Sequence, residues 1–203
     1  MTRRRRRLAA AAAVLTVLTG CAGSDAHPAG PPQTTDRAAR GLEAARSFRV
    51  PRTYRATPVP VRLHIPRIEV TTSLEPLGRA SDGTVEVPNR SDLAGWYAPG
   101  PRPGDPGSAV ILGHVDSDRG PAVFYRLREL RAGDQLTVTR ADGSVARFVV
   151  RRTRQYDKQQ FPTDEVYYPT LRPTLRLITC GGQFDPADGH YKSNLIVFAT
   201  ARS

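Results

Sequence analysis

The sequence predicts an all-β domain, a closed or nearly closed, antiparallel-rich barrel or sandwich of seven or eight short strands. From about residue 61 onward, short runs of branched and aliphatic residues alternate with turn signals. Two of these signals are the Asp-Gly pairs at 82–83 and 142–143, where glycine accepts the positive φ that hairpin turns require. No long amphipathic helix interrupts the pattern, which favours a barrel or sandwich over an α/β fold.

We expect strands in residue order at 61–65, 68–71, 84–87, 109–112, 136–139, 145–151, 175–180 and 194–200. Residues 124–130 predict one or two helical turns with Leu127 and Leu130 facing inward, and residues 156–169 predict a long loop or short helix over one end of the barrel. A region of roughly 140 residues is long enough to bury a core without disulfides.

The basic character of the chain is concentrated at its N-terminus. The 203 residues carry a formal net charge of +11, but residues 1–20 contain five arginines and no acidic residue. Removing those five from the 30 basic residues leaves 25 against 19 acidic residues, a net charge of +6. The absence of aromatic residues interleaved with the basic clusters argues against nucleic-acid binding.

Residues 1–20 have the pattern of an export signal. The arginines precede an apolar run at 8–18, which is shorter than the roughly 20 residues of a membrane-spanning helix. Leu18-Thr19-Gly20-Cys21 resembles a bacterial lipobox, which predicts cleavage before Cys21 and lipid attachment to it. The alternative is an uncleaved signal anchor. In both cases we expect the protein at the extracytoplasmic face of the membrane.

Residues 21–58 are poor in large apolar residues and rich in proline, which predicts a flexible tether. Within it, residues 36–46 are compatible with a short helix capped by Asp36. The expected organisation is therefore a signal peptide at 1–20, a tether at 21–58 and a folded domain at 59–203.

With Cys21 assigned to lipidation, Cys180 is the one remaining thiol of an exported chain. Exported domains usually pair their cysteines or lack them, so a single leftover thiol is accidental, paired between molecules, or reactive. Cys180 ends the predicted buried strand 175–180 and precedes Gly181 and Gly182. A rigid strand end followed by a flexible turn is suited to a nucleophile.

A cysteine nucleophile needs a proton partner, and the chain has four histidines. His27 lies in the tether, His64 in the first predicted strand, and His190 in a polar turn, where ordinary structural or solvated roles are expected. His114 follows the predicted strand 109–112 just as Cys180 ends its own strand. Two such strand ends can meet at one rim of a barrel.

These residues carry a family resemblance. The Thr179-Cys180 pair after a Leu-x-Leu-Ile strand, together with Gly113-His114-Val115-Asp116 earlier in the chain, resembles the cysteine and histidine motifs of sortases. Further segments are similar to the actinobacterial class F branch: 65–70, 94–97, 104–107 and 181–185, with Tyr191 and Asn194. The resemblance covers about residues 60–203 and implies a sortase-type closed barrel with short helices and a long loop before the cysteine strand.

The resemblance implies a cysteine transpeptidase, an enzyme of the thiol peptidase type. Cys180 as thiolate would attack a threonyl carbonyl in a C-terminal sorting signal and form a thioester. His114 as imidazolium would protonate the leaving amine, and an amine such as that of a peptidoglycan precursor would release the product. The resemblance implies no cofactor and no metal, and we expect a monomer.

The family's third residue, an arginine on the last strand, is missing. Alignment of the closing strand puts Asn194 at that position and Lys192 two residues earlier, and alternation lets both face the same side. Either could stabilise the oxyanion or position the substrate, although a solvated lysine is an equal alternative for Lys192. Asp116 could orient the imidazole or simply form a turn.

Weaker signals and rival functions remain open. Asp157, Asp164 and Glu165 could bind calcium, but their spacing matches no calcium loop and solvated carboxylates are favoured. An L,D-transpeptidase would place histidine and glycine immediately before the cysteine, where Ile178 and Thr179 stand. A non-catalytic, lipid-anchored surface binding module is the alternative of a different class.

Overall fold

The computed structural model describes residues 56–187 and 189–202, which fall within one compact unit, Tyr54–Ser203. The expectations for the signal peptide, the lipidation site Cys21 and the helix at 36–46 lie outside the described residues, as does nearly all of the tether. In the described part of the chain, no helix is long and apolar enough to span a membrane.

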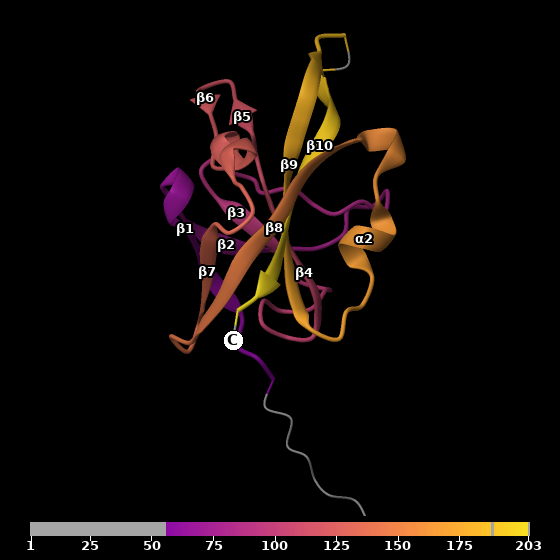
Figure 1. The fold of residues 1–203 in the computed structure, drawn as a ribbon. Coiled ribbons are helices and arrows are strands. Elements are labelled where there is room, and N and C mark those ends of the chain that lie inside the picture. The colour runs from indigo at the N-terminus through magenta and orange to yellow at the C-terminus, as the bar shows by residue number, and fades with distance from the viewer. Residues whose placement is uncertain (1–55, 188, 203) are drawn as a thin grey trace, which may run out of the picture. The chain divides into compact units, whose positions relative to one another are not determined.

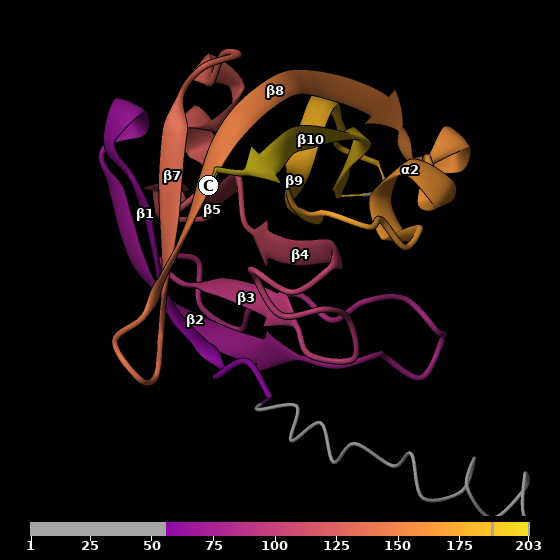
Figure 2. The same cartoon turned by 60° about the horizontal axis from the view of Figure 1, so that its bottom comes forward.

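Eight strands form a closed barrel, as the sequence predicts (Figure 1). Around the barrel their order is β1-β2-β3-β4-β9-β10-β8-β7, and the ring is visible when the molecule is turned (Figure 2). Two of the neighbouring pairs, β2–β3 and β4–β9, are parallel and the others are antiparallel. The barrel strands are β1 (Pro60–Ile65), β2 (Val70–Leu77), β3 (Ala94–Tyr97), β4 (Gly107–Gly113), β7 (Gln135–Arg140), β8 (Val145–Asp157), β9 (Pro173–Asp185) and β10 (His190–Ala201).

Short elements fill the connections. The helical turns predicted at 124–130 form η2 (Tyr125–Glu129), and Leu127 and Leu130 are buried as expected. The loop predicted before the cysteine strand holds η3 (Lys158–Gln160) and α2 (Thr163–Tyr167). The remaining elements are η1 (Pro66–Ile68), β5 (Asp116–Ser117) and β6 (Gly120–Pro121).

The barrel wall separates two apolar clusters because strand side chains alternate between its faces. On β9, Leu175 and Leu177 point into the barrel and belong to the inner cluster with Ile111, Phe124 and Phe148. Ile178 belongs to an outer cluster, which also contains Tyr97, Val110, Val166, Ile196 and Phe198. The outer cluster lies where α2 packs beside β4 and β9 (Figure 1).

The observed strands differ from the expected ones in several places. The strand expected at 68–71 starts only at Val70 and runs to Leu77, because Pro66–Ile68 forms η1. Residues 84–87 form no strand, and only an isolated bridge joins Val85 to Arg79. The predicted strands omit β3, whose four residues are too short to show an alternating pattern. Cys180 does not end its strand, because β9 continues to Asp185 and pairs with a β10 that begins at His190. His190 therefore lies in a strand rather than in a turn.

Candidate active site

Cys180 lies on the outer face of the barrel wall, in the middle of β9. Its free thiol is half-buried, and it shares the outer face with Ile178 and Arg176, two and four residues earlier. Directly across the antiparallel pair, Cys180 is opposite Asn194 of β10. The side chains of such cross-strand partners project from the same face of a sheet, so Asn194 lies beside the thiol.

His114 reaches the same level from the other side of β9. The parallel pairing of β4 with β9 runs to Leu112 opposite Ile178, and His114 stands two residues beyond Leu112. His114 follows the end of β4 at Gly113, so it stands two residues beyond Leu112 just as Cys180 stands two residues beyond Ile178. His114, Cys180 and Asn194 therefore form one row across neighbouring segments, here called the catalytic row.

Gly113 allows close packing of the chain immediately before His114. A Cβ atom on Gly113 would lie 2.6 Å from a ring carbon of Phe124 and 2.8 Å from a methyl carbon of Val123. Phe124 is fully buried, and its backbone N–H donates to the carbonyl of His114 at 2.9 Å. The missing side chain at 113 thus allows the end of β4 to pack against residues 123–124, and the hydrogen bond from Phe124 holds the backbone of His114.

The His114 ring is held by a backbone carbonyl. Its Nε2 lies 2.7 Å from the carbonyl oxygen of Pro88, a buried residue. A carbonyl only accepts, so Nε2 carries the proton. Within the described part of the chain no hydrogen bond reaches Nδ1, which is left to exchange a proton with a thiol or a leaving amine. A hydrogen bond at one ring nitrogen fixes the tautomer of the imidazole and so determines whether the other nitrogen carries a proton.

Asp116 makes its contact with Tyr191 rather than with the imidazole. The Tyr191 hydroxyl donates to Asp116 Oδ2, and this hydrogen bond is the main reason why the pKa of Tyr191 is raised; burial and the nearby charges of Asp116 and Cys180 act in the same direction. Tyr191 also packs edge-on against Phe184, with 5.2 Å between ring centroids. The Asp116–Tyr191 pair thus links β5 to the β9–β10 hairpin near the thiol.

Lys192 and Asn194 are separated by a β-bulge, although simple alternation would let them share a face. The pairing of β10 with β9 shifts register between Tyr191 and Ser193. Lys192 is exposed and forms an ion pair with Asp185, with Nζ 3.2 Å from Oδ2. It lines a separate pocket near the end of the hairpin, whereas Asn194 lines the groove described below.

A glycine with positive φ completes the bulge. Gly182 has φ 77°, and a Cβ there would lie 2.7 Å from the Ser193 hydroxyl oxygen and 3.0 Å from Ser193 Cβ. Ser193 is itself buried and donates to Asp157 Oδ1 at 3.0 Å. The glycine after Cys180 and Gly181 is therefore needed inside the hairpin, two residues beyond the thiol.

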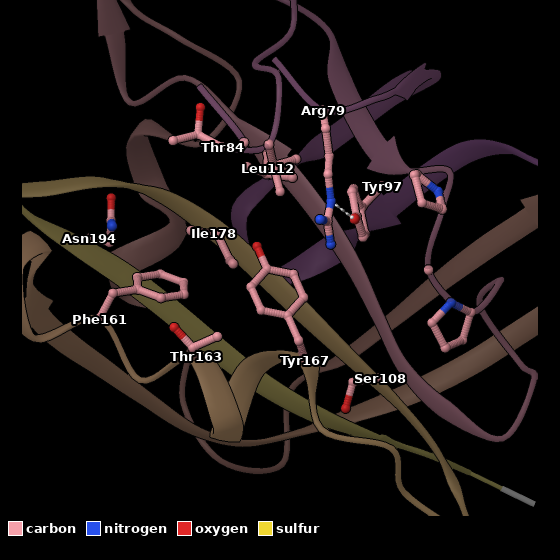
Figure 3. A pocket seen from close by; sticks show the side chains of 15 residues that line it. Arg79, Thr84, Tyr97, Ser108, Leu112, Phe161, Thr163, Tyr167, Ile178 and Asn194 are labelled. Atoms are coloured by element: carbon pink, nitrogen blue, oxygen red, sulfur yellow. Dashed lines mark hydrogen bonds between the residues drawn. The ribbon is translucent and has the colours of Figure 1, made fainter. Parts of the chain in front are cut away.

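A groove of about 720 Å³ runs along the outer face beside the catalytic row (Figure 3). Its floor is formed by Leu112 of β4 and Ile178 of β9, and Asn194 lies at one side of it. Phe161, Thr163 and Tyr167 line it from the loop that contains α2, while Arg79 and Tyr97 line it from the opposite side. The Tyr97 and Tyr167 rings meet edge to face, with centroids 5.9 Å apart.

Two arginines hold the α2 wall in place. Arg152 forms an ion pair with Glu165 of α2 at 2.6 Å, and Arg176 Nε donates to the Glu165 carbonyl at 3.2 Å. Both guanidinium groups lie over the Phe198 ring, 4.0 and 4.8 Å from its centroid. Burial, assisted by the charge of Arg152, lowers the pKa of Arg176 to about 10. The position of Tyr167 in the groove depends on this anchorage.

The carboxylates considered for calcium are dispersed. Asp157 accepts from Ser193, and Glu165 is paired with Arg152. Among residues 56–187 and 189–202, no group of three or more histidine, cysteine, aspartate or glutamate side chains is arranged to hold a metal ion.

Several residues of the site carry no local sequence signal. The carbonyl of Pro88 and the side chain of Arg79 reach the site from irregular segments between β2 and β3. Tyr97 and Tyr167 come from a short strand and from a short helix. Tyr97 and Tyr191 stand out only through the class F resemblance. The Gly113-His114 and Thr179-Cys180 pairs after apolar runs could identify the row, but nothing local points to the groove walls.

Comparisons with known proteins concern the family and the fold. A family model, described as Sortase domain, matches residues 63–202. Among solved structures, the chain is similar to sortase C-1 from Actinomyces oris (22% identity, TM-score 0.56, covering 70% of this chain and 71% of that chain). It is also similar to a lid mutant of sortase A from Corynebacterium diphtheriae (20% identity, TM-score 0.56, covering 74% of each chain). A third similar structure is sortase C1 from Streptococcus agalactiae (17% identity, TM-score 0.56, covering 70% of this chain and 67% of that chain). No curated protein matches the chain.

Proposed function

The chain belongs to the sortase family of extracytoplasmic cysteine transpeptidases, and we propose that it cleaves C-terminal sorting signals through a thioester on Cys180. The observation that carries this proposal is the catalytic row: a half-buried thiol with a histidine on one side and an amide on the other, beside a groove. The acceptor is an amine of the cell envelope, such as that of a peptidoglycan precursor.

The first half-reaction uses the thiol and the imidazole together. The Cys180 thiolate attacks the threonyl carbonyl carbon, and the carbonyl oxygen becomes an oxyanion. An ordinary thiol with a pKa of about 8.5 is only a few per cent ionised at pH 7, and a neighbouring imidazolium favours the thiolate. When the tetrahedral intermediate collapses, the C–N bond breaks and His114 donates a proton from Nδ1 to the leaving amine. The thioester remains on Cys180.

The second half-reaction reverses these roles. The acceptor amine attacks the thioester carbonyl, and neutral His114 takes a proton from that amine. Collapse of the intermediate forms an amide bond and releases the Cys180 thiolate. The hydrogen bond from Nε2 to the Pro88 carbonyl at 2.7 Å supports this cycle, because it persists in the neutral ring and in the imidazolium.

Asn194 stands where other family members have an arginine, so we assign it the role of stabilising the oxyanion. Its carboxamide offers neutral N–H donors from the residue directly opposite Cys180. A neutral amide stabilises developing charge less than a guanidinium does, which predicts slow acylation. Lys192 is a weaker candidate because its ammonium is paired with Asp185 across the bulge.

Intact-protein mass spectrometry tests the reaction. With a Leu-Pro-x-Thr-type sorting peptide, the wild-type protein should gain the mass of the acyl fragment, and Cys180→Ala should gain none. His114→Gln should acylate far more slowly. His64→Gln is the matched control, since His64 lies on β1 and its Nδ1 is 2.8 Å from the Thr71 hydroxyl of β2. Transpeptidation by Cys180→Ala would refute the assignment.

The absence of the family arginine favours one alternative function, that of a surface module that binds peptides without cleaving them. A thiol-directed sorting-signal vinyl sulfone separates the two. Modification of Cys180 that depends on His114 supports the transpeptidase, and modification that is indifferent to His114 supports the binding module.

We further propose assignment to the class F branch, supported by the segments 65–70, 94–97, 104–107 and 181–185 with Tyr191 and Asn194, and attachment to the membrane through lipidated Cys21. Mass spectrometry of the mature N-terminus tests the attachment. A diacylglyceryl-modified Cys21 is expected, and an unmodified Met1 would instead indicate an uncleaved signal anchor.

A further inference from the structure

The groove contains a cation that the transpeptidase chemistry does not use. Arg79 lies in the segment after β2, where its backbone bridges to Val85. Its Nε donates to the Tyr97 hydroxyl at 2.7 Å, and its guanidinium carbon lies 5.9 Å from the centroid of that ring. Figure 3 shows Arg79 against Tyr97, with Tyr167 and Ile178 between Arg79 and Asn194. The tyrosine thus holds the arginine head at the groove.

Arg79 is the one charged side chain among the described residues that line this groove. It forms no ion pair with any residue in the described ranges, in contrast to Arg90, Arg126 and Arg152. A guanidinium has five N–H donors in a planar fork, and the bond to Tyr97 occupies one. The remaining donors match a carboxylate, which a guanidinium can bind through two parallel hydrogen bonds.

Strand register locates this cation along the bound peptide. The β3–β4 pairing of Trp96 with Ile111 puts Tyr97 at the level of Val110, which pairs with Arg176 on β9. Arg176 precedes Cys180 by four residues, about 13 Å along a strand. An extended peptide has nearly the same rise for each residue, so the Arg79–Tyr97 pair lies about four residues from the carbonyl over Cys180.

We propose that Arg79 makes this groove selective for sorting signals with an aspartate or glutamate about four residues before the threonine whose carbonyl is attacked. In a Leu-Pro-x-Thr-type signal this is the residue just before leucine. Tyr97 positions the guanidinium, the edge of Tyr167 closes the side of the subsite, and the peptide carboxylate supplies the anion that this part of the groove lacks. The inference rests on the proposed function, in which this groove binds the sorting signal.

The test compares three peptides that carry glutamate, glutamine or lysine just before a Leu-Pro-x-Thr core. Acylation of Cys180 is followed by mass spectrometry, and affinity is measured by fluorescence anisotropy with Cys180→Ala. We expect the glutamate peptide to exceed the glutamine peptide about five- to tenfold in both assays. Moving the glutamate two positions toward the N-terminus should reduce the preference.

Variants identify the source of the preference. Arg79→Gln should bring the glutamate-to-glutamine ratio close to one, and Arg79→Glu should reverse the order so that the lysine peptide is preferred. Arg147→Gln is the matched control, since Arg147 is an exposed arginine on β8 outside the groove, and it should keep the wild-type ratio. Melting temperatures of all variants show that each is folded.

The outcomes separate this inference from the proposed reaction. Equal acylation and affinity for the three peptides, or a preference that survives Arg79→Gln, would overturn the role of Arg79 while leaving the transpeptidase intact. An Arg79-dependent preference in the binding assay without any acylation would uphold the charge-reading groove and contradict the reaction.

Discussion

Replacing Gly182 with alanine tests the role of the bulge beside Cys180. At φ 77° a side chain costs about 1–2 kcal/mol of backbone strain. The new Cβ would also lie 2.7 Å from the Ser193 hydroxyl oxygen, so Ser193 must move. That movement breaks its 3.0 Å hydrogen bond to Asp157, worth about 1 kcal/mol. The free energy of unfolding should therefore fall by about 2–3 kcal/mol.

Thermal denaturation provides the assay. For a domain of this size the loss corresponds to a decrease in Tm of about 5–10 °C. Gly181→Ala is the control, because Gly181 has no positive φ and a Cβ there would be 3.4 Å from its nearest neighbour, Leu195. Its Tm should change by less than about 2 °C. Equal decreases in the two variants, or none in Gly182→Ala, would refute the reasoning from the bulge.

Three further predictions concern the surroundings of the thiol. Single-turnover mass spectrometry should show acylation slowed on the order of 100-fold by Asn194→Ala and changed less than about twofold by Lys192→Ala. Equal effects of the two substitutions would show that Asn194 does not stabilise the oxyanion. Thr179→Val should raise the free energy of unfolding in urea by about 1 kcal/mol, because the Thr179 Oγ1 is buried and has no hydrogen-bond partner in the described part of the chain; a decrease would show that the hydroxyl is satisfied. Tyr191→Phe should destabilise the protein at pH 8, and the difference from wild type should shrink above pH 10. Folding raises the pKa of Tyr191 through its hydrogen bond to Asp116. This bond therefore stabilises the protein at pH values below the ordinary tyrosine pKa, and the stabilisation is lost as pH rises through the raised pKa of the folded state. A stability difference between Tyr191→Phe and wild type that stays constant to pH 11 would contradict this.

The barrel was predictable because its strands carry their own signals. Alternating apolar residues mark most of them, the Asp-Gly pair at 142–143 marks the β7–β8 turn, and η2 follows from the spacing of Leu127 and Leu130. The end of β9 was not predictable. Two glycines after Cys180 are typical of a chain leaving a strand, whereas Gly182 here forms a bulge inside a longer hairpin. Local propensity cannot distinguish these cases, because the hydrogen bonds that continue the strand come from β10.

The catalytic row shows a similar division. Cys180 and His114 stand out in the sequence by residue type and by their place after apolar runs. Their alignment with Asn194 depends on the registers of two strand pairs, and the separation of Lys192 depends on the bulge. Arg79 could not be found from sequence, because it lies in an irregular segment and acquires its place only when β2 and β3 pair. Contacts between distant segments leave no periodic signal in either one.

The alternation along β4 and β9 has a practical consequence for changing specificity. Leu112 and Ile178 face the groove, whereas their immediate neighbours Ile111 and Leu177 are fully buried inside the barrel. Substitutions at every second position can therefore reshape the peptide-binding surface while the interior packing is retained. A combinatorial library restricted to outward positions should yield many folded variants with altered preferences, whereas one built on inward positions should yield mostly unstable protein.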